Sequence, residues 1–571
     1  MKYLWKVGGE AGFGIMTTGL VFSKIASRSG YHVFDYNEYP SLIRGGHNTY
    51  EVLFSEGEVY ASQRHIDLLL CLNKETYDLH KERLSSSSIV VYDPQEFDFE
   101  EDFIKVQVPF WQWLKENEAK YLMANTIAVG VSLGLLGGEI SYLHDILAKE
   151  FARKGEEVVA YNKKFANLGY EHIKNNYAKH IQPHLAIKKA EQKLVLSGND
   201  AFSLGAVIAD CRFYCAYPMT PSSQVLAVLA GWQHKTGMVV RHAEDEISVI
   251  MTALGSSFAG ARSAIGTSGG GFALMVEAIS FAGVTELPLV IFLGMRPGPA
   301  TGMPTWTEQG DLLFAAHAGH GEFPKIVLAP GDMEEVVEQS IKAFDLADIY
   351  QTPVIVVSDK FLCEAHNTID RSIVENIIKK YKVDRGKTVV QTKQSPYLRY
   401  KVESDGISER LIPGQEGLYY QANSYEHDET GHTSEHASDR QAQVDKRNKK
   451  WQTYLAKHYE GPKIFGDLKK AKIVLVSWGA NKGPIQDARS LLAKEGIDTA
   501  YIHFTHVYPI AEIGLPSFSE SGKRYILIEN NSHAQFGRML REETGIQIKE
   551  KLLKYDGRPF WPEEIAEYVK K

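Results

Sequence analysis

Residues 217–223 read Tyr-Pro-Met-Thr-Pro-Ser-Ser and directly follow an apolar run at 213–216 that has the length of a short strand. A second segment of the same kind, residues 296–305, reads Arg-Pro-Gly-Pro-Ala-Thr-Gly-Met-Pro-Thr and follows the apolar run 287–293. Both segments combine rigid prolines and small residues with hydroxyl groups, which is typical of fixed loops at strand ends, where functional sites tend to lie. We therefore expect the two loops to frame one site.

The size and charge of the chain restrict the classes of protein to consider. Its 571 residues predict about three or four domains. With a net charge of -8, the chain is not expected to be a generic nucleic-acid binder. No apolar run reaches the roughly 18 residues that a membrane helix needs, and the nearest, residues 126–138, predicts a buried helix. Without a signal-peptide pattern at the start, we expect a cytoplasmic protein.

The four cysteines do not have the spacing of a metal site. Cys211 and Cys215 are separated by three residues, and neither Cys71 nor Cys363 forms a second pair beside them. An iron–sulfur cluster needs four thiolates at closer, repeated spacing. We expect buried, reduced thiols, and no metal on this chain; if the protein transfers electrons, its clusters lie on another chain.

The alternation of apolar runs, glycine turns and helical segments predicts an α/β fold. In the first part of the chain, the strand at residues 4–7 runs into a glycine turn at 8–14 and a helix at 15–29, which favours a parallel sheet. The turn lacks the ordered glycine fingerprint of a nucleotide site, so it is a weak candidate for NAD binding. Further strands are expected at 31–36, 49–54, 66–72, 213–216, 239–241, 263–265, 287–293, 325–329, 353–358 and 472–477.

The two proline-rich loops closely resemble those of the alpha subunit of the 2-oxoacid:ferredoxin oxidoreductases. Residues 8–14 and 39–48 are similar to the gamma domain of the same family, which is often fused ahead of alpha. The resemblance implies three domains in this order. The boundaries that we predict are 1–181 for a gamma-type domain, 182–193 for a linker, 194–381 for a thiamine-diphosphate pyrimidine-binding domain, 382–465 for a polar, solvated inter-subunit insertion and 466–571 for a transketolase C-terminal-like domain.

The resemblance also implies that this chain holds only half of a thiamine diphosphate site. Such enzymes bind the diphosphate through Mg²⁺ with a Gly-Asp-Gly run, which this chain lacks, and the pair at 530–531 lacks that partner. The pyrimidine half requires one carboxylate facing the ring nitrogen. The activating glutamate of the family precedes a small-residue turn, here residues 255–260, and counting back reaches Glu246. Glu244 is the alternative, because it also lies at the strand end, where a carboxylate of shifted pKa is expected. The helix dipole alone would explain two of the three acids at 244–246.

The remaining site residues follow from the same resemblance. The 2-oxoacid carboxylate is expected on the planar guanidinium of Arg296, which can bind it in bidentate fashion, although an exposed loop arginine is the alternative. Thr220 is expected to hydrogen-bond the substrate, unless it caps the helix that starts near Pro221. The glycines at 269–271 let the backbone approach a flat ligand, or pack a helix on a strand. Substrate contacts are also predicted for Thr301 and Thr305, and cofactor contacts for Tyr217, Pro218, Ser268, Gly269 and Gly270.

Two polar segments have weaker interpretations. Residues 426–429, Glu-His-Asp-Glu, invite a metal site, but they lie in a segment without a periodic framework, and a family resemblance favours partner contact. Contact with coenzyme A is expected in the segment 529–537 and in the gamma-type domain. The residues that we assign to this contact are Asn531, Ser532, Gly12 and Arg44.

The function that the resemblance implies is oxidative decarboxylation of a 2-oxoacid with coenzyme A, giving an acyl-CoA, CO₂ and reduced ferredoxin, or the reverse carboxylation. The fused layout favours 2-oxoglutarate over pyruvate or a branched-chain 2-oxoacid. A beta subunit is expected to carry the diphosphate and Mg²⁺ site and a [4Fe-4S] cluster, in an (alpha-beta)₂ heterotetramer that reduces ferredoxin. The alternatives are a transketolase-like thiamine enzyme without an electron acceptor and a non-catalytic scaffold subunit.

Overall fold

The computed structural model describes residues 2–41, 45–191, 193–512, 514–518 and 522–571. The chain divides into two compact units, which are described separately. Unit 1 comprises Met1–Leu196, Glu364–Val374 and Trp561–Glu567, and unit 2 comprises Ser197–Cys363, Glu375–Phe560 and Tyr568–Lys571. Within the described ranges, no helix has both the length and the apolar content that crossing a bilayer requires.

Unit 1 is built on an eight-stranded mixed sheet with the order β6-β5-β4-β1-β3-β2-β14-β7. The strands are β1 (Lys2–Glu10), β2 (His32–Glu38), β3 (His47–Ser55), β4 (Leu68–Cys71), β5 (Ile89–Tyr92), β6 (Ile104–Gln107), β7 (Lys193–Ser197) and β14 (His366–Asp370). The predicted strands are present, but the expectation of a parallel sheet is wrong for half of it. β1 is parallel to β4 and antiparallel to β3, which is also antiparallel to β2. Helix α1 connects β1 to β2, and β3 follows β2 in sequence but pairs between the two strands, antiparallel to both. This pairing decides the strand direction, which the apolar pattern does not encode.

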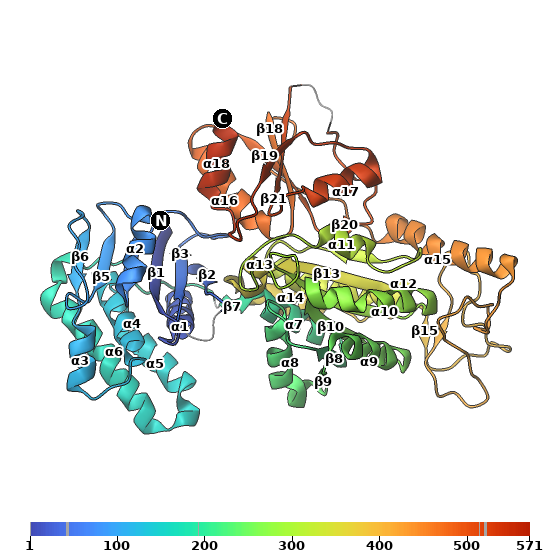
Figure 1. Cartoon of the computed structure of the whole chain (residues 1–571), viewed down its shortest axis with the longest axis horizontal. Helices are drawn as coiled ribbons and strands as arrows, with labels where there is room; N and C mark the ends of the chain where they lie inside the picture. Colours follow the sequence, from blue (N-terminus) through green and yellow to red (C-terminus); the bar gives the residue numbers. More distant parts are fainter. Residues whose placement is uncertain (1, 42–44, 192, 513, 519–521) are drawn as a thin grey trace. The chain divides into compact units, whose positions relative to one another are not determined.

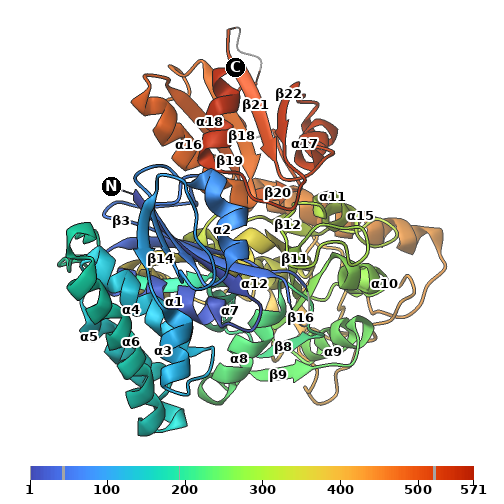
Figure 2. The same cartoon turned by 60° about the vertical axis from the view of Figure 1, so that its left-hand side comes forward.

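The helices of unit 1 include the predicted buried helix as α4, which packs along α6 (Figures 1 and 2). Gly130 of α4 faces the backbone of Ala166, and Gly169 of α6 faces the backbone of Ile127, so a side chain at either glycine would collide with the other helix. The lack of a Cβ therefore lets the two helices approach closely. The helices are α1 (Ile15–Arg28), α2 (Lys74–His80), α3 (Phe110–Glu116), α4 (Met123–Leu136), α5 (Ile140–Glu150) and α6 (Glu156–Asn176).

The described residues of the stretch 182–193, predicted to be a linker, belong to unit 1. The backbone N–H of Gln182 donates to the carbonyl of Leu135, and Leu185 is fully buried. The backbone N–H of Lys188 donates to Ser29, and β7 then joins the sheet from Lys193. The linker prediction rests on the charged side chains of this stretch. The backbone of its described residues is hydrogen-bonded to unit 1, so they are packed against that unit.

Unit 2 contains a seven-stranded sheet with the order β20-β12-β13-β11-β10-β8-β9, parallel except for β20 at one edge. Its strands are β8 (Phe213–Ala216), β9 (Val239–His242), β10 (Ser263–Ser268), β11 (Leu289–Met295), β12 (Ile326–Leu328), β13 (Pro353–Asp359) and β20 (His506–Tyr508). On one face, Phe292 of β11 stacks on Phe202 of α7, with 4.3 Å between ring centroids. The preceding residue, Ile291, belongs to the core on the opposite face, together with residues of α9 and α10. Helices thus cover both faces of the sheet, as expected for an α/β domain.

A five-stranded sheet follows in the C-terminal part of unit 2, with the order β17-β19-β18-β21-β22. Its strands are β17 (Lys463–Phe465), β18 (Ile473–Trp478), β19 (Thr499–Phe504), β21 (Arg524–Glu529) and β22 (Glu550–Leu553). β20 lies in this part of the sequence but pairs with β12 of the seven-stranded sheet, and one apolar core includes residues of both sheets. The two sheets are therefore joined into one compact unit.

The helices around these two sheets position the loops described below. In unit 2 they are α7 (Gly198–Ile208), α8 (Ser223–Thr236), α9 (Glu246–Phe258), α10 (Gly269–Thr285), α11 (Leu312–His317), α12 (Met333–Tyr350), α15 (Ala437–Lys457), α16 (Lys482–Lys494) and α17 (Gln535–Thr544). Helices α13 (Lys360–Glu364), α14 (Arg371–Lys380) and α18 (Pro562–Lys570) each contain residues of both units. Two short strands, β15 (Thr388–Val389) and β16 (Arg410–Leu411), pair outside the sheets.

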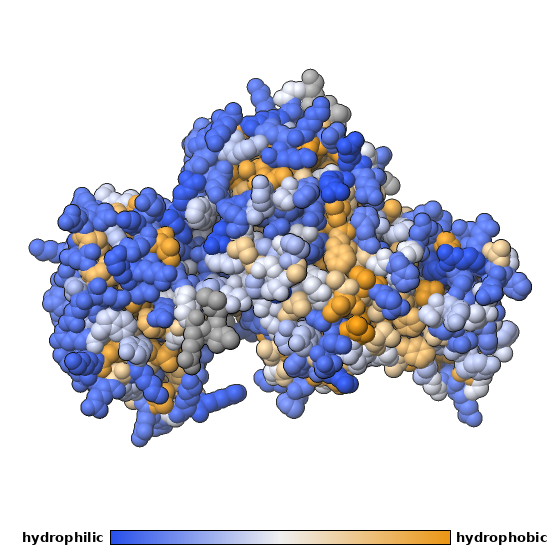
Figure 3. Space-filling view, in the orientation of Figure 1, coloured by the Kyte–Doolittle hydropathy of each residue, from blue (hydrophilic) through white to orange (hydrophobic). Residues whose placement is uncertain are grey.

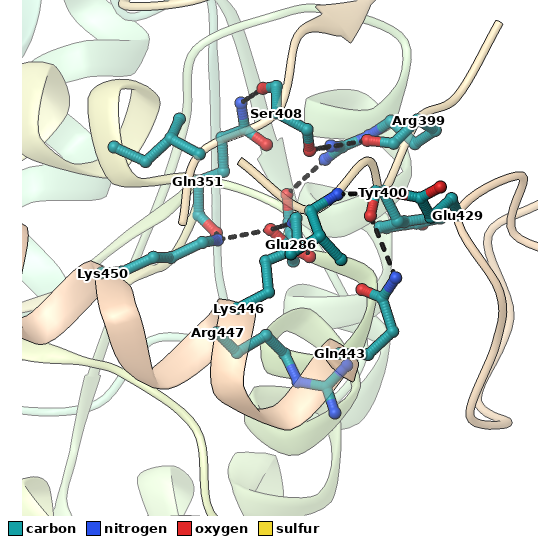
Figure 4. Close-up of polar contacts among 12 residues, drawn as sticks. Glu286, Gln351, Arg399, Tyr400, Ser408, Glu429, Gln443, Lys446, Arg447 and Lys450 are labelled. Atoms are coloured by element: carbon teal, nitrogen blue, oxygen red, sulfur yellow. Dashed lines mark hydrogen bonds and ion pairs between the residues drawn. The ribbon is translucent and has the colours of Figure 1, made fainter. Parts of the chain in front are cut away.

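The segment 382–465 differs from the solvated insertion that we predicted, because it contains the 21-residue helix α15. Lys446 and Lys450 of this helix are buried and bind Glu286 at the end of α10, with N–O distances of 2.5 and 2.6 Å (Figure 4). Burial alone would raise the pKa of Glu286, but the two ammonium groups outweigh it and hold that pKa far below its usual range. The charge-rich pattern resembles a solvated face because the acid that pairs with its lysines lies much earlier in the sequence.

Candidate active site

The two proline-rich loops meet at one edge of the seven-stranded sheet. Residues 217–223 follow β8 and residues 296–311 follow β11, and both strands flank β10 in parallel orientation. The Arg296 guanidinium Nη1 donates to the Thr220 carbonyl oxygen at 2.8 Å. This bond shows that the two loops are in contact, and their role as a common site stays a prediction. Carboxyl ends of parallel strands are where ligands bind in α/β sheets.

Thr220 does not cap the following helix. α8 begins at Ser223, and its N-cap residue is Ser222. The Ser222 hydroxyl donates to the Met219 carbonyl and accepts no hydrogen bond from a helix N–H. The alternative role for the Thr220 hydroxyl, a helix cap, is therefore not seen. Its backbone carbonyl instead fixes Arg296.

Glu246 and Glu244 differ sharply in their surroundings. The Glu246 side chain is 5% exposed and begins α9, whereas Glu244 is exposed. Asp245 is the N-cap, and its carboxylate accepts from the Ser248 N–H at 2.6 Å. An ideal Cβ built on Gly271 would lie 2.7 Å from Glu246 Oε1, so the glycine makes room for that carboxylate. Of the two candidate acids, Glu246 is the one that faces the glycine turn, residues 269–271 at the start of α10.

The glycine turn, residues 269–271, is the first turn of α10 and follows directly on Ser268, the last residue of β10. Together they present an unbonded hydroxyl and bare backbone. The Ser268 hydroxyl is fully buried and has no hydrogen-bond partner among the described residues. An ideal Cβ on Gly270 would have no atom within 4 Å, whereas one on Gly269 would lie 2.5 Å from Asp311 Oδ2. A buried hydroxyl without a partner costs free energy, so a ligand that bonds to it would remove that cost. Ser268 and the glycine turn therefore fit a polar, flat group lying against their backbone.

Two carboxylates near Arg296 were not identified from the sequence. Burial lowers the pKa of the Arg296 guanidinium, and the charge of Asp311 opposes that effect. Burial raises the pKa of Asp311 to about 6, against the attraction of Arg296, and burial with the nearby charge of Asp311 raises the pKa of Glu308 to about 7. The only sequence signal for these residues was their place in the loop that begins at Arg296. Groups that titrate near neutral pH beside a cation are typical of functional sites.

The other predicted contacts in this region are divided between surface and core. Tyr217 is 39% exposed, and Pro218 and Thr301 are exposed as well. Thr305, by contrast, is 5% exposed, so its side chain lies within the loop. Residues at the rim can contact a ligand or a second chain, and Thr305 is placed to support the loop.

The residues predicted to contact coenzyme A have different environments. Asn531 is 1% exposed, and its side chain bonds to Gln309, Glu529, His533 and Gln535. Its polar atoms are thus used within unit 2, which argues against direct contact with coenzyme A. Ser532 is exposed, and the backbone of Gly12 in unit 1 is open, with no atom within 4 Å of an ideal Cβ. Arg44 lies outside the described residues.

The Glu-His-Asp-Glu stretch is part of the protein's own packing. Glu426 accepts a bidentate pair of hydrogen bonds from Arg447, at 3.0 and 2.7 Å, and another bond from Arg440. The His427 ring is buried and lies 3.2 Å from the Val284 carbonyl oxygen. Across the described ranges, no group of three or more His, Cys, Asp or Glu side chains is placed to hold a metal ion.

Comparison with known proteins gives matches along the whole chain. Residues 204–446 match the family described as "Pyruvate flavodoxin/ferredoxin oxidoreductase, thiamine diP-bdg", and residues 4–172 match "Pyruvate ferredoxin/flavodoxin oxidoreductase". The chain is 31% identical to the 2-oxoacid:ferredoxin oxidoreductase subunit alpha of Saccharolobus solfataricus over 631 residues, covering 100% of this chain and 98% of that protein. It is 29% identical to the 2-oxoglutarate synthase subunit KorA of Methanothermobacter thermautotrophicus, covering 66% of this chain and 99% of that protein.

A solved structure is similar over the same extent. The 2-oxoglutarate:ferredoxin oxidoreductase from Magnetococcus marinus, solved with 2-oxoglutarate, coenzyme A and succinyl-CoA bound, superposes with a TM-score of 0.91. The two chains are 31% identical, and the match covers 100% of this chain and 99% of that one. The fold described above is therefore the fold of that protein.

Proposed function

Because the chain belongs to the 2-oxoacid:ferredoxin oxidoreductase family as an alpha subunit with a gamma domain fused ahead of it, we propose that it oxidises 2-oxoglutarate with coenzyme A. The products are succinyl-CoA, CO₂ and reduced ferredoxin, and the reverse carboxylation uses the same site. The choice of 2-oxoglutarate is supported by the names of the similar structure and of the Methanothermobacter relative. The observation that carries the proposal is the buried Glu246 carboxylate beside the glycine turn at the start of α10.

The residues present fit the pyrimidine half of thiamine diphosphate, which the matched family is described as binding. Glu246 would bond to the ring nitrogen and hold the proton there, and its burial keeps water from competing. Ser268 supplies a buried hydroxyl without a partner, and Gly270 leaves space over the backbone. When bound, the cofactor supplies the carbon nucleophile that attacks the keto group of the substrate.

The substrate carboxylate is assigned to Arg296. Its Nη1 is occupied by the Thr220 carbonyl, which leaves the Nη2 and Nε side of the guanidinium for a carboxylate. Partial burial strengthens such a charge-assisted pair because fewer waters compete for it. Thr301 and the Thr220 hydroxyl, at the mouth of the same region, are the proposed neutral contacts.

A second subunit is proposed to complete the site. The chain lacks the Gly-Asp-Gly run for the diphosphate and Mg²⁺. Around the loops, large apolar side chains are exposed: Ile247 by 52%, Met251 by 44%, Leu274 by 55% and Phe314 by 36%. Figure 3 shows apolar side chains gathered on the visible face of unit 2, and such a patch is typical of a protein interface. We assign it to a beta subunit with Mg²⁺ and a [4Fe-4S] cluster, in an (alpha-beta)₂ assembly that reduces ferredoxin.

Coenzyme A is proposed as the co-substrate. The Magnetococcus structure contains it, and Ser532 and Gly12 are the two predicted contact residues whose surfaces are open in this chain. Replacing Gly12 by valine should raise the KM for coenzyme A more than the KM for the 2-oxoacid. The backbone φ of +101° at Gly12 also favours glycine, so a Gly12→Asn variant separates backbone strain from lost access.

The test is purification of the complex from its native host, followed by a screen of 2-oxoacids with coenzyme A and a viologen dye. We expect viologen reduction that needs both coenzyme A and a 2-oxoacid, fastest with 2-oxoglutarate. A pyruvate or branched-chain preference would correct the substrate alone. Turnover without any electron acceptor, in a complex without iron, would instead indicate a transketolase-like enzyme, and a complex inactive with every 2-oxoacid would indicate a scaffold subunit.

A further inference from the structure

Gln309 lies in the middle of the loop that begins at Arg296, and it is 0% exposed. Its side-chain Oε1 accepts from Asn481 Nδ2 at 2.9 Å and from the Asn530 backbone N–H at 3.1 Å, and its Nε2 donates to the Trp478 carbonyl at 3.3 Å. Its backbone N–H donates to the Asn530 carbonyl at 2.7 Å, and its own carbonyl accepts from Asn531 Nδ2 at 3.1 Å. Both ends of the amide and both backbone groups are thus bonded.

The partners of Gln309 all come from the five-stranded sheet. Trp478 ends β18 and Asn481 follows it, while Asn530 and Asn531 follow β21, the strand that pairs with β18. Asn481, Asn530 and Asn531 are each less than 5% exposed. Gln309 is therefore inserted into a buried polar socket at the carboxyl ends of two neighbouring parallel strands.

The same part of unit 2 contacts the rest of the loop. The Thr307 N–H donates to the Gly557 carbonyl at 3.1 Å, and the Arg558 guanidinium lies 3.2 Å from the centre of the Trp306 ring. Gln535 bonds to the Gly310 carbonyl and to the Leu313 N–H, at 2.5 and 3.0 Å. Three separate stretches of the C-terminal sequence thus hold residues 306–313 in place.

Glu308 and Asp311, one residue before and two residues after Gln309, do not take part in these hydrogen bonds. Neither Glu308 nor Asp311 makes a side-chain hydrogen bond or ion pair among those recorded for the described residues, and both lie in the electrostatic field of the site. Residues 297–311 contain no helix or strand, so the backbone there depends on outside partners. Fixing Gln309 therefore fixes the backbone next to Glu308 and two residues before Asp311.

We propose that Gln309 is a positioning residue through which the C-terminal sheet of the chain sets the geometry of the substrate loop. The inference rests on the proposed function, because it assigns that loop to the 2-oxoacid. A glutamate in place of Gln309 could not donate to the Trp478 carbonyl, and a leucine would leave Asn481 and the Asn530 N–H without their acceptor. The active site would then respond to changes in a domain that does not contact the substrate.

The experiment compares Gln309→Leu with a control, Gln339→Leu, in the purified complex. Gln339 of α12 is also buried, at 2% exposed, and it makes no recorded contact with the loop. Amide hydrogen exchange is followed in residues 301–313 and in α12. We expect Gln309→Leu to raise exchange in residues 301–313 about 10- to 100-fold, and the control to leave that segment unchanged. We also expect kcat/KM for the 2-oxoacid to fall roughly 10- to 100-fold, with the KM for coenzyme A within about twofold.

Unchanged exchange in residues 301–313, or equal effects of the two variants, would overturn the proposal. If Gln309→Leu does not fold, Asn481→Ala removes one donor to the Gln309 Oε1 and should give a smaller change in the same segment. Unchanged exchange there would also overturn it. Hydrogen exchange does not depend on turnover, so a wild-type complex inactive with every 2-oxoacid would contradict the proposed function and still test the role of Gln309.

Discussion

Replacing Arg296 by lysine keeps the positive charge and removes the fork of donors. In the wild type, Nη1 is bonded to the Thr220 carbonyl at 2.8 Å, and the other donors of the guanidinium are left for the substrate. A lysine ammonium cannot hold the carbonyl and present two parallel bonds to a carboxylate at the same time. Losing one charge-assisted bond in a half-buried place costs about 1.5–3 kcal/mol. This corresponds to roughly ten- to a hundredfold in kcat/KM for the 2-oxoacid.

The assay measures initial rates of viologen reduction while the 2-oxoacid and coenzyme A are varied separately. We expect the KM for the acid to rise far more than the KM for coenzyme A. Arg241→Lys is the matched control, because Arg241 is an exposed arginine at the end of β9, and its replacement should change both constants little. If the kinetic constants for the acid stay unchanged in Arg296→Lys while coenzyme A binding weakens, Arg296 belongs to the coenzyme site and the reasoning is wrong.

Three further outcomes are expected. The isolated chain, assayed with thiamine diphosphate, Mg²⁺, 2-oxoacid and coenzyme A, should show no turnover, and activity without a second polypeptide would refute the two-subunit site. Glu286→Gln leaves two buried lysines without their counter-charge and should destabilise the docking of α15 by about 3–5 kcal/mol, measured by hydrogen exchange, whereas the partly exposed Glu550→Gln should cost about 0–1 kcal/mol. Because Glu308 and Asp311 ionise near pH 7 and 6, the KM for the anionic substrate should rise from pH 6 to 8, and Glu308→Gln should flatten that rise.

Several strands and the buried helix of unit 1 could be predicted from local sequence, and the site residues stay a prediction. The apolar run at 213–216 coincides with β8, and the helix expected at 126–138 overlaps α4, because burial of a strand or helix is visible in its own residues. The two proline-rich loops are linked in the sequence analysis by their place at strand ends and by the family resemblance, and in the structure they are in contact. The buried position of Glu246 agrees with the carboxylate that the family resemblance favoured over Glu244.

Features that depend on distant partners could not be predicted. Helix α15 was missed because its lysines are neutralised by Glu286, 160 residues earlier than Lys446. Gln309 gave no signal because its acceptors and donors lie 169 to 222 residues away in sequence. The antiparallel pairing of β1 with β3 was missed because apolar periodicity does not encode strand direction. In each case, a contact between residues far apart in sequence decided the structure, and the local pattern does not encode such a contact.

The central claim is that Glu246 is the carboxylate that activates the cofactor in 2-oxoacid oxidation. It is tested by the rate of acyl-CoA formation in complexes that carry Glu246→Gln or Glu244→Gln. The buried Glu246 variant should assemble normally and lose on the order of 10²–10⁴-fold in rate, because a positioned proton-transfer group is removed. The exposed Glu244 variant should stay within a few-fold of the wild type. A Glu246→Gln complex with nearly wild-type activity, beside an inactive Glu244→Gln complex, would contradict the assignment.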